Sequence, residues 1–409
     1  MKNILFLSYD GLTDPLGQSQ IIPYLAGLTQ FGYRFTIISC DKPNRYEKYN
    51  QQIKEILKPY PIKWVSIPYH KNPPVLSSIY DVIVMKQKVS ALHARDKFDM
   101  VHTRAGTPAL VGLWMKKKYG VKFLNDLRDF FADSRLDSGS WKSNNPVYRK
   151  VYQYFKGKEE EAIEKNDGIV CLTQAAEKII RQWPQFKPGL PLQVIPCSVD
   201  MDLFNPGSID PNTKKTFARG LGIREKDIIF SYLGSIGGWY LTHEILQCCK
   251  ILSDAIPTAK FLFISPHGHE TIVEKAKQLG LAEEKLILKQ ADRSEVPLLL
   301  SLSSYSLFFI KPCYSKQASS PTKHGEIMAM GIPLITNSGV GDVAEIVQQY
   351  QSGMVLNHLT EEAYINLAEA LLNKTSFNSQ AIRAGAMEYF NLKTAIDKYH
   401  LLYEAILEA

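Results

Sequence analysis

The feature that most constrains this fold is an alternation of short apolar runs with longer helical patterns along the whole chain. Near-continuous apolar runs of about four to eight residues are typical of strands that helices cover on both faces. Helical patterns between such strands indicate crossover connections and therefore parallel sheets. We predict strands at NILFLSYD, FTIISCD, KWVSIPY, DMVHTR, VKFLNDL, GIVCLT and LQVIPC in the first half, and at IIFSYLG, KFLFISP, KLILKQ, YSLFFIKP, PLITN and GMVLN in the second.

Length and one turn-rich segment divide the chain in two. A chain of 409 residues is too long for a single hydrophobic core of ordinary size, so we expect two domains of about 200 residues each. Residues 194–215 hold prolines and turn residues between a strand and a fresh helix at Lys214–Leu221, which is typical of a domain boundary. We therefore predict doubly wound α/β domains at 1–200 and 201–390. The expected helices include Gln20–Gln30, Val82–Arg95, Tyr148–Lys165, Thr242–Asp254 and Thr271–Leu279.

Positive charge is concentrated in the first half. Residues 1–205 hold 29 Lys and Arg against 20 Asp and Glu, whereas residues 206–409 hold 19 against 21. A basic half is expected to face something anionic. We find no recognition helix or RNP-like aromatic motif, so we predict no nucleic-acid partner. A phosphorylated acceptor, an anionic membrane surface and a solvated basic face without a partner remain as interpretations. Tyr148–Lys165 is the candidate for peripheral membrane contact, although its acidic middle favours packing on its own domain.

Cysteine usage and the N-terminus indicate a cytoplasmic protein, with peripheral contact at the inner membrane face as a further option. The six cysteines are scattered, with no C-x-x-C pair and no histidine at zinc spacing, so we expect reduced thiols and no structural metal. The apolar stretch of MKNILFLSYDG is too short for a secretory signal, and we find no apolar run long enough to cross a membrane.

Residues 311–345 carry the most specific chemical signal. A polar stretch with Ser319, Ser320, Thr322 and Lys323 runs into a short apolar helix at Glu326–Met330, and a strand and a second glycine turn follow. Loops that lead into helix N-termini bind anions, because free N–H groups and the helix dipole both favour negative charge. A lysine suits a diphosphate, and a carboxylate one turn later suits two ribose hydroxyls. This pattern predicts a nucleotide-linked substrate. The alternatives are a surface lysine and a first-turn glutamate that only stabilises its helix.

A glycine-rich turn supports this interpretation. Gly234-Ser235-Ile236-Gly237-Gly238 lies between the strand IIFSYL and the helix Thr242–Asp254. Glycines at such a turn let a backbone approach a phosphate. The spacing is not G-x-G-x-x-G, which argues against a dinucleotide, and a plain tight turn is the alternative. Asp292 and Arg293 follow the strand KLILKQ in a comparable loop.

Polar residues also follow two strands of the first half. Arg104, Asp126 and Arg128 lie at the carboxyl ends of VHTR and FLNDLRD, where ligands bind in open α/β sheets. A salt-bridged structural cluster is the alternative. His102 lies inside its strand, which favours a core histidine over one with access to a substrate.

Four segments resemble a known family. They are ILFLSYDGLTDPLGQSQIIPYLAGL, VIPCSVDMDLF, YLGSIGGWY and SSPTKHGEIMAMGIPLITNSGVGD. Together they make the chain similar to the retaining glycosyltransferases of family 4, in a branch with an S-x-P-x-K-x-x-E donor loop. The resemblance implies the GT-B architecture, two facing Rossmann-like domains with a cleft between them. It implies acceptor binding in 1–200, nucleotide-sugar binding in 201–390, and a last helix at about Leu392–Leu407, within 391–409, that crosses back to the first domain.

The sequence departs from the family pattern in three places. Glu326 matches the second of two donor-loop glutamates, but Ala318 occupies the position of the first. Ser235 and about Tyr240 stand where a basic pair is usual, and Arg104 stands where a histidine is common. The resemblance therefore suggests that Lys323 supplies the missing charge.

The resemblance also implies roles for the candidate residues. Lys323, Glu326 and Arg104 would form the reacting centre, and Asp126, Arg128 and His102 would bind the acceptor. The residues expected at the donor are Gly17, Gly234, Ser235, Gly237, Asp292, Arg293, Ser320 and Thr322. Of these, Gly17 would approach the diphosphate from the first domain, and the loop with Asp292 and Arg293 would cradle the base.

We thus expect a metal-independent retaining glycosyltransferase without a cofactor. Its donor would be a nucleotide-diphosphate sugar, most simply one of UDP or GDP, and its acceptor a glycan or lipid-linked sugar of a surface polysaccharide. A nucleotide-sugar 2-epimerase on the same architecture is an alternative, because it would need no acceptor. A catalytically silent binding protein is a third possibility, suggested by the absent glutamate and basic pair.

Overall fold

The computed structural model describes residues 1–373 and 376–408 and contains two compact units. The first comprises residues 1–197, 317–319 and the C-terminal segment from Leu392, and the second comprises 198–316 and 320–391. The sequence placed the boundaries near 200 and 390. The short stretch Gln317–Ser319, which groups with the first unit, was not expected there.

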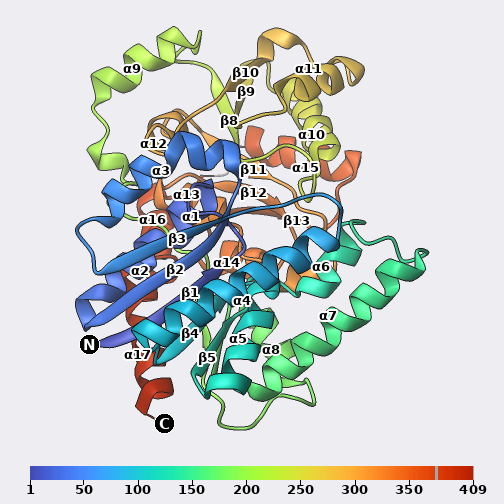
Figure 1. Ribbon diagram of the computed structural model, residues 1–409. Coiled ribbons are helices and arrows are strands. Elements are labelled where there is room, and N and C mark those ends of the chain that lie inside the picture. The colour runs from blue at the N-terminus through green and yellow to red at the C-terminus, as the bar shows by residue number, and fades with distance from the viewer. Residues whose placement is uncertain (374–375, 409) are drawn as a thin grey trace. The chain divides into compact units, whose positions relative to one another are not determined.

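The first unit is built on a seven-stranded sheet of order β3-β2-β1-β4-β5-β6-β7, with every pairing parallel (Figure 1). Its strands are β1 (Lys2–Ser8), β2 (Tyr33–Asp41), β3 (Ile62–Pro68), β4 (Met100–Arg104), β5 (Lys122–Asp126), β6 (Gly168–Cys171) and β7 (Leu192–Val194). Strand β1 pairs with β2 over its whole length, from Lys2 opposite Tyr33 to Ser8 opposite Ser39. The predicted strands of the first half are confirmed.

Helices cover both faces of this sheet. They are α1 (Pro15–Gln20), α2 (Ile22–Leu28), α3 (Pro43–Leu57), α4 (Leu76–Asp96), α5 (Gly106–Tyr119), α6 (Phe131–Asp137), α7 (Pro146–Lys165), α8 (Gln174–Arg181) and α17 (Leu392–Glu408). Strand β1 shows why both faces need cover, because Ile4 and Phe6 join a core with α2 and α17 whereas Leu5 and Leu7 join another with α4 and α5. Alternate residues of a strand point to opposite faces, so an all-apolar strand needs two apolar layers.

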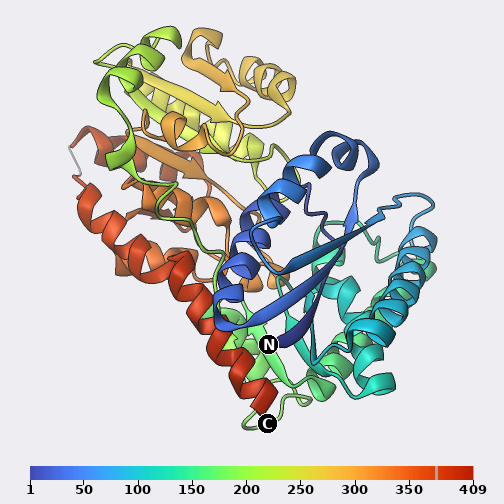
Figure 2. The same cartoon turned by 60° about the vertical axis from the view of Figure 1, so that its left-hand side comes forward.

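The last helix, α17, belongs to the first unit. It lies beside α2, β5 and β7, and Figure 2 shows it in red next to the blue α2. Six of its side chains are buried in the same core as Ile4 and Phe6: Ala395, Ile396, Tyr399, Leu402, Tyr403 and Ile406. Gly27 and Gly168 allow this close packing, since an added Cβ would lie 2.3 Å from Ile396 Cδ1 and 2.5 Å from Ile406 Cδ1.

The second unit repeats the design with six parallel strands in the order β10-β9-β8-β11-β12-β13. These are β8 (Ile228–Leu233), β9 (Ala259–Ile264), β10 (Leu286–Lys289), β11 (Tyr305–Phe308), β12 (Leu334–Asn337) and β13 (Gly353–Leu356). Its helices are α9 (Pro211–Gly220), α10 (Thr242–Ala255), α11 (His269–Gln278), α12 (Val296–Leu300), α13 (Thr322–Ala329), α14 (Val343–Gln349), α15 (Glu361–Leu372) and α16 (Ser379–Tyr389). The strands predicted for the second half are confirmed.

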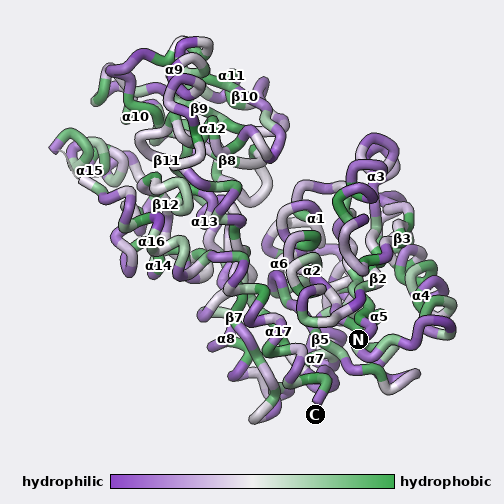
Figure 3. The backbone as a smooth tube through the Cα atoms, turned by 90° about the vertical axis from the view of Figure 1, so that its left-hand side faces the viewer, coloured by the Kyte–Doolittle hydropathy of each residue, from purple (hydrophilic) through white to green (hydrophobic). Residues whose placement is uncertain are grey.

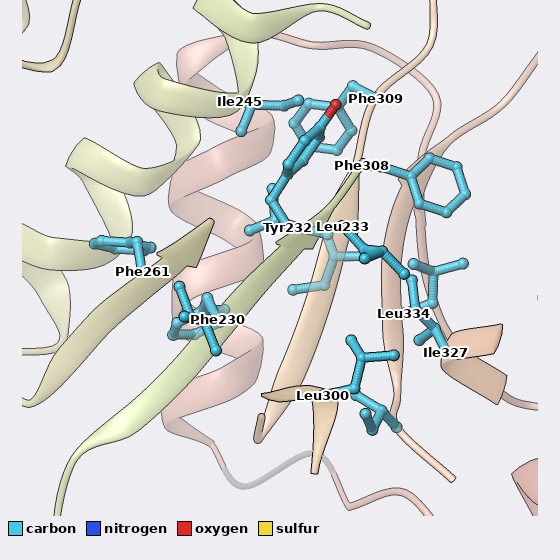
Figure 4. Close-up of a cluster of buried hydrophobic side chains, with 14 of the residues drawn as sticks. Phe230, Tyr232, Leu233, Ile245, Phe261, Leu300, Phe308, Phe309, Ile327 and Leu334 are labelled. Atoms are coloured by element: carbon cyan, nitrogen blue, oxygen red, sulfur yellow. The ribbon is translucent and has the colours of Figure 1, made fainter. Parts of the chain in front are cut away.

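Aromatic side chains dominate the core of the second unit. Figure 4 shows part of it, including Phe230, Phe261 and Phe308. The Phe230 ring stacks on Phe261 at 5.8 Å and on Tyr305 at 5.4 Å. Helix α13 is inserted into this core, because all its residues from Lys323 to Ala329 are buried. A helix buried on every side carries its polar side chains into the interior with it.

Three predicted helices differ from the observed ones by more than a shift of up to three residues at an end. The helix expected at Gln20–Gln30 is two helices, α1 and α2, that meet at Ile21, because Pro23 has no N–H with which to continue the ladder from α1. Helix α4 begins at Leu76, six residues before the predicted Val82. Helix α13 begins at Thr322 rather than Glu326, since Pro321 suits a helix entry. The hydropathy colouring of Figure 3 shows α3 and α9 as largely hydrophilic, as surface helices should be.

Candidate functional site

Lys323 lies in the first turn of α13 in the second unit, and its side chain is buried. Its amine sits among three aromatic rings, with Nζ 3.6 Å from the centroid of Tyr240, 4.5 Å from Tyr232 and 5.6 Å from Phe308. Among the described residues Nζ has no hydrogen-bond partner. The negative ring faces attract a cation, but they cannot replace the hydrogen bonds of water.

Burial sets the protonation of this amine. It lowers the pKa of Lys323 to about 7, and the nearby Glu326 carboxylate opposes part of the shift. A lysine with this pKa is about half protonated at neutral pH, because burial penalises the charged form. The charge of the Lys323 amine would therefore change when a charged ligand binds next to it.

Gly234 makes room for this lysine. It directly follows β8 and has φ +120°, a conformation that residues with a side chain rarely adopt. A Cβ added there would lie 2.7 Å from Lys323 Nζ. Its N–H donates to Ile264 O at 2.9 Å, which fixes the turn to β9. The glycine predicted from the strand-to-helix turn is thus required by Lys323 itself. Gly237 and Gly238 also have positive φ values of 78° and 64°, and the space beside their Cα atoms is open.

Glu326 is held by an arginine from another loop. Its Oε1 accepts from Arg293 Nη1 at 2.8 Å, and the guanidinium of Arg293 also lies over the ring of Phe204. The structure therefore brings Lys323, Glu326 and Arg293 together from segments 30 residues apart. No ion pair joins Lys323 to Glu326 in the described part of the chain, so the carboxylate is oriented by Arg293 rather than by the lysine.

The other residues predicted for the donor are arranged around this group. Thr322 is the first residue of α13, and no side chain caps that helix start. Ser320 precedes it and is half-buried. Ser235 is exposed, and its carbonyl accepts from the Tyr232 hydroxyl. Asp292 is exposed beside Arg293 and its backbone N–H donates to Glu295 Oε2 at 2.8 Å.

Sequence reasoning missed the aromatic partners of the site. Tyr232 and Phe308 were interpreted only as strand residues, and Tyr240 as the place of a missing basic residue. A second contact of this kind joins Lys316 to the Trp239 ring at 3.8 Å. The motif YLGSIGGWY contains three of these aromatic residues, so its composition carried the signal.

His324 is a further buried group that the sequence did not single out. Its ring lies 6.3 Å from Phe308 and 5.2 Å from Phe390, and neither nitrogen has a partner among the described residues. Burial lowers its pKa to about 3. This histidine is neutral at all physiological pH values.

In the first unit, Arg104, Asp126, Arg128 and His102 form one buried cluster at the carboxyl ends of β4 and β5. Asp126 accepts from Arg128 Nη1 at 3.2 Å, from the Tyr399 hydroxyl at 2.9 Å and from His102 Nε2 at 3.4 Å. Because Nε2 donates there, Nδ1 of His102 is the acceptor for the Tyr403 hydroxyl at 2.6 Å. His102 thus has both nitrogens occupied by the protein, as in a core histidine.

The cluster buries more positive than negative charge. Burial alone would raise the pKa of Asp126, but Arg128, His102 and Arg104 outweigh it and hold that pKa well below its usual range. Burial, reinforced by Arg128, lowers the pKa of Arg104. Nε and Nη1 of Arg104 and Nε of Arg128 have no partner within the described residues. These donors are available to an anionic or hydroxyl-rich ligand.

Backbone geometry at the end of β4 is strained. Ala105, directly after Arg104, has φ +65° and ψ −179°, a region that is nearly confined to glycine and that clusters at functional sites. Its N–H donates to Asp126 O at 3.0 Å. The strained backbone therefore lies directly after Arg104, at the end of β4.

Close packing explains why small residues occupy positions 17 and 318. An added Cβ at Gly17 would lie 2.3 Å from Gly11 O and 2.6 Å from Leu12 Cα, so α1 needs a glycine to pack on the loop that precedes it. Ala318 is buried in an apolar cluster of the first unit with Leu127 and Phe130. A glutamate at 318 would bring an unpaired carboxylate into that cluster.

The described residues contain no disulfide, metal cluster or membrane-spanning helix. The six cysteines form no disulfide bond with one another. In the part of the chain that the structure describes, no three His, Cys, Asp or Glu side chains gather as a metal site would require. The helices of that part include none long and apolar enough to span a bilayer.

The second unit is similar to a known protein family. Residues 213–387 match the family model of glycosyl transferases group 1. No curated protein matches the chain.

Solved structures match the whole chain at low identity. Sucrose-phosphate synthase from Thermosynechococcus elongatus has a TM-score of 0.76 at 14% identity, over 99% of this chain and 98% of that one. Anabaena HepE in complex with UDP has a TM-score of 0.69 at 15% identity, over 98% of each chain. A putative UDP-N-acetylglucosamine 2-epimerase from Listeria monocytogenes has a TM-score of 0.62 at 12% identity, over 100% of this chain and 97% of that one.

Similarity at these identities establishes the fold, which agrees with the two parallel sheets described above. The family match lies in the unit that contains Lys323, Glu326 and the glycine turn. The chain therefore has the GT-B fold, and residues 213–387 of its second unit are similar to the glycosyl transferases of group 1.

Proposed function

We propose that the protein is a retaining glycosyltransferase that uses a nucleotide-diphosphate sugar without a metal or cofactor. The observation that carries this proposal is the buried, unpartnered amine of Lys323 beside a glycine turn and an uncapped helix start. An amine placed in this way suits the diphosphate of a donor, and backbone N–H groups of the first turn of α13 would add to its effect.

The leaving group explains why such a site would be catalytic. Sugar transfer passes through an oxocarbenium-like transition state while negative charge grows on the departing phosphate. Preorganised donors aimed at that charge are usually the largest catalytic contribution. Lys323 would stabilise the leaving diphosphate, and Glu326, oriented by Arg293, would accept hydrogen bonds from two ribose hydroxyls.

Donor binding would also change the charge of Lys323. The pKa of this amine is lowered to about 7 by burial, and an arriving diphosphate would favour the ammonium form. The enzyme would therefore take up a fraction of a proton when the donor binds near neutral pH. A buried amine that is charged only when its ligand is bound destabilises the ligand-free protein less than a permanently charged buried amine would.

The acceptor would bind in the first unit. Arg104, strained Ala105 and the Asp126–Arg128 pair lie at the carboxyl edge of the sheet, where ligands of open α/β sheets bind. The unpartnered nitrogens of the two arginines suit hydroxyl or phosphate oxygens. We propose a glycan or lipid-linked sugar as acceptor and a UDP- or GDP-sugar as donor, with HepE bound to UDP as the supporting neighbour.

The test is a thermal-shift panel of UDP-, GDP- and ADP-linked sugars, followed by product analysis. We expect one nucleotide to raise the melting temperature of the wild type and of Lys226→Met, which removes an exposed lysine of the same unit, but not of Lys323→Met. NMR of the product should show the anomeric configuration of the donor retained. Stabilisation of Lys323→Met equal to that of the wild type would refute the site.

An epimerase is the second candidate, supported by the Listeria neighbour. Such an enzyme would convert the donor sugar without an acceptor. Incubation with the donor alone separates the two, since a transferase yields at most slow hydrolysis, whereas a 2-epimerase yields a new nucleotide sugar.

A further inference from the structure

In the first unit a buried carboxylate orients a histidine that lies outside the cluster around Asp126. His70 follows β3 and Asp81 lies in α4, with Nδ1 of His70 2.6 Å from Asp81 Oδ1. The second carboxylate oxygen accepts from the His70 backbone N–H at 3.2 Å and from the Tyr9 hydroxyl at 2.8 Å. Asp81 is 1% exposed, so every contact of this carboxylate is internal.

This arrangement fixes which nitrogen of His70 faces outward. A carboxylate only accepts hydrogen bonds, so Nδ1 carries a proton for Asp81 and Nε2 is the nitrogen left for a ligand. The His70 side chain is 43% exposed, and its Nε2 has no partner among the residues that the structure describes. A preoriented ring nitrogen at the surface suits the hydroxyl of a ligand, which can donate or accept a hydrogen bond. Holding the loop in place would need the contact of Nδ1 alone.

An exposed aromatic ring lies beside this histidine. Tyr80 contacts the His70 ring edge-on, with centroids 5.2 Å apart, and is 55% exposed. A ring face that is open to solvent beside a hydrogen-bonding group suits a sugar, which has an apolar face and a polar rim.

The apolar surface continues from Tyr80 along the same helix. Leu76, Ile79 and Ile83 are 63%, 51% and 48% exposed, and with Tyr80 they follow the i, i+3, i+4, i+7 spacing of a single helix face. Val75, at the start of α4, has φ +70°, which is strained for a β-branched residue. Neighbouring exposed apolar side chains on one face of a helix are typical of a binding surface.

The position of this surface relates it to the proposed acceptor site. β3 and β4 are separated by β2 and β1 in the sheet order, so their carboxyl ends lie about 14 Å apart at the usual strand spacing. That separation is close to the length of a disaccharide with a short linker. An acceptor with its reacting end at Arg104 would therefore extend over Tyr9 toward His70 and the apolar face of α4.

We propose that the acceptor is amphiphilic, with a sugar held by His70 and Tyr80 and an alkyl chain lying on Leu76, Ile79 and Ile83. The inference rests on the proposed function, which it deepens by naming the acceptor as lipid-linked. The continuity of the polar pair with the apolar face is what favours an amphiphile over a free glycan or a protein partner.

The test uses n-octyl β-D-glucopyranoside below its micelle concentration as a probe, with binding measured by calorimetry on the full chain. We expect saturable binding to the wild type, weakened about tenfold in Ile79→Ser/Ile83→Ser because two apolar contacts are lost. Ile56→Ser on α3, which removes a comparably exposed isoleucine of the same unit, should bind like the wild type. Equal weakening in both variants, or no binding to the wild type, would overturn the proposal.

The sugar contact has its own readout. Tetraethylene glycol monooctyl ether has the same chain without a sugar, and the wild type should prefer the glucoside by about fivefold, the effect of one or two hydrogen bonds. His70→Ala should abolish that preference and leave ether binding unchanged, whereas Tyr60→Ala, on an exposed tyrosine elsewhere in the unit, should keep it. A preference that survives in His70→Ala would remove His70 from the site.

Other occupants and a failure of the proposed function give different results. Binding to phosphatidylglycerol vesicles that needs Ile79 and Ile83, with no binding of the glucoside, would make the surface a membrane contact and overturn the amphiphile. Dimerisation that depends on the same residues would overturn it equally. Stabilisation by a nucleotide sugar tests only the donor site, and it should persist in every α4 variant.

Discussion

The two units bury cations in opposite ways. In the first, Arg128 and Arg104 lie beside Asp126, whose oxygens also accept from Tyr399 and His102. In the second, Lys323 lies among aromatic rings with no hydrogen-bond partner among the described residues. A buried ion pair holds its charges at every pH near neutrality, because each partner favours the charged form of the other. A buried amine without a partner is free to change charge, so one cluster is fixed and the other is responsive.

The largest expected effect comes from removing the shared carboxylate of the fixed cluster. Asp126→Asn would leave Arg104 and Arg128 buried without a counter-charge, and we expect the first unit to lose ~3–5 kcal/mol of stability. Urea unfolding followed by the fluorescence of its tryptophans measures this loss. Glu55→Gln, which changes a highly exposed carboxylate of the same unit, should be neutral. A loss below about 1 kcal/mol for Asp126→Asn would mean that water already neutralises the cluster.

Removing the responsive cation should have the opposite effect on stability. Lys323→Met keeps the apolar stem and removes an amine without hydrogen bonds, so we expect a higher melting temperature together with a rate reduced by about 10²–10³. Thermal unfolding and transfer of a nucleotide sugar are measured on the same preparation. If Lys323→Met is both less stable and inactive, the lysine is structural and the contrast between the units fails.

The pH dependence of stability should sharpen the contrast. The pKa of Lys323 is lowered from 10.5 to about 7 in the folded chain, so between these values the unfolded state holds a proton that the native state lacks. The contribution of Lys323 to stability therefore rises with pH above 7, by ~2 kcal/mol between pH 7 and 9. The measurement is the difference between wild type and Lys323→Met in urea unfolding at each pH. A difference that stays constant over this range would place the pKa of the amine near its ordinary value.

The smallest expected effect is the energetic coupling between the amine and the glycine beside it. Gly234→Ala would add a Cβ 2.7 Å from Lys323 Nζ on a residue with φ +120°, and we expect ~1–3 kcal/mol of destabilisation from the backbone strain. The contact with Nζ disappears in Lys323→Met, so part of the cost should be recovered in the double variant. A double-mutant cycle by urea unfolding gives that coupling, and a coupling of zero would show that Gly234 is needed only for the turn.

Much of the fold could be predicted because it depends on local patterns. Apolar runs such as FTIISCD and IIFSYL identify strands by themselves, and the helical patterns between them require parallel order. The pairing of Lys323 with Glu326 could also be predicted, because the two lie three residues apart after a loop of serines and a proline, although the helix begins four residues earlier than expected.

The surroundings of the site could not be predicted from the sequence. Tyr232, Tyr240 and Phe308 reach Lys323 from two strands and a loop, and nothing in one segment reveals which side chains of another will face it. The pair of Arg293 and Glu326 likewise joins residues separated by 33 positions, and His102 meets Tyr403 across 301. Such contacts follow from the packing of layers, which local patterns do not determine.

The last helix has a consequence for how the protein is made. The hydroxyls of Tyr399 and Tyr403 complete the hydrogen bonds of Asp126 and His102, and their helix covers the apolar face that contains Ile4 and Phe6. These partners follow the second unit in the chain, although the sheet that they complete precedes it. One apolar face of the first unit's sheet therefore stays uncovered while the whole second unit is synthesised. A chain interrupted before Leu392 would keep that face exposed, and we expect chaperones and proteases to recognise it as unfinished.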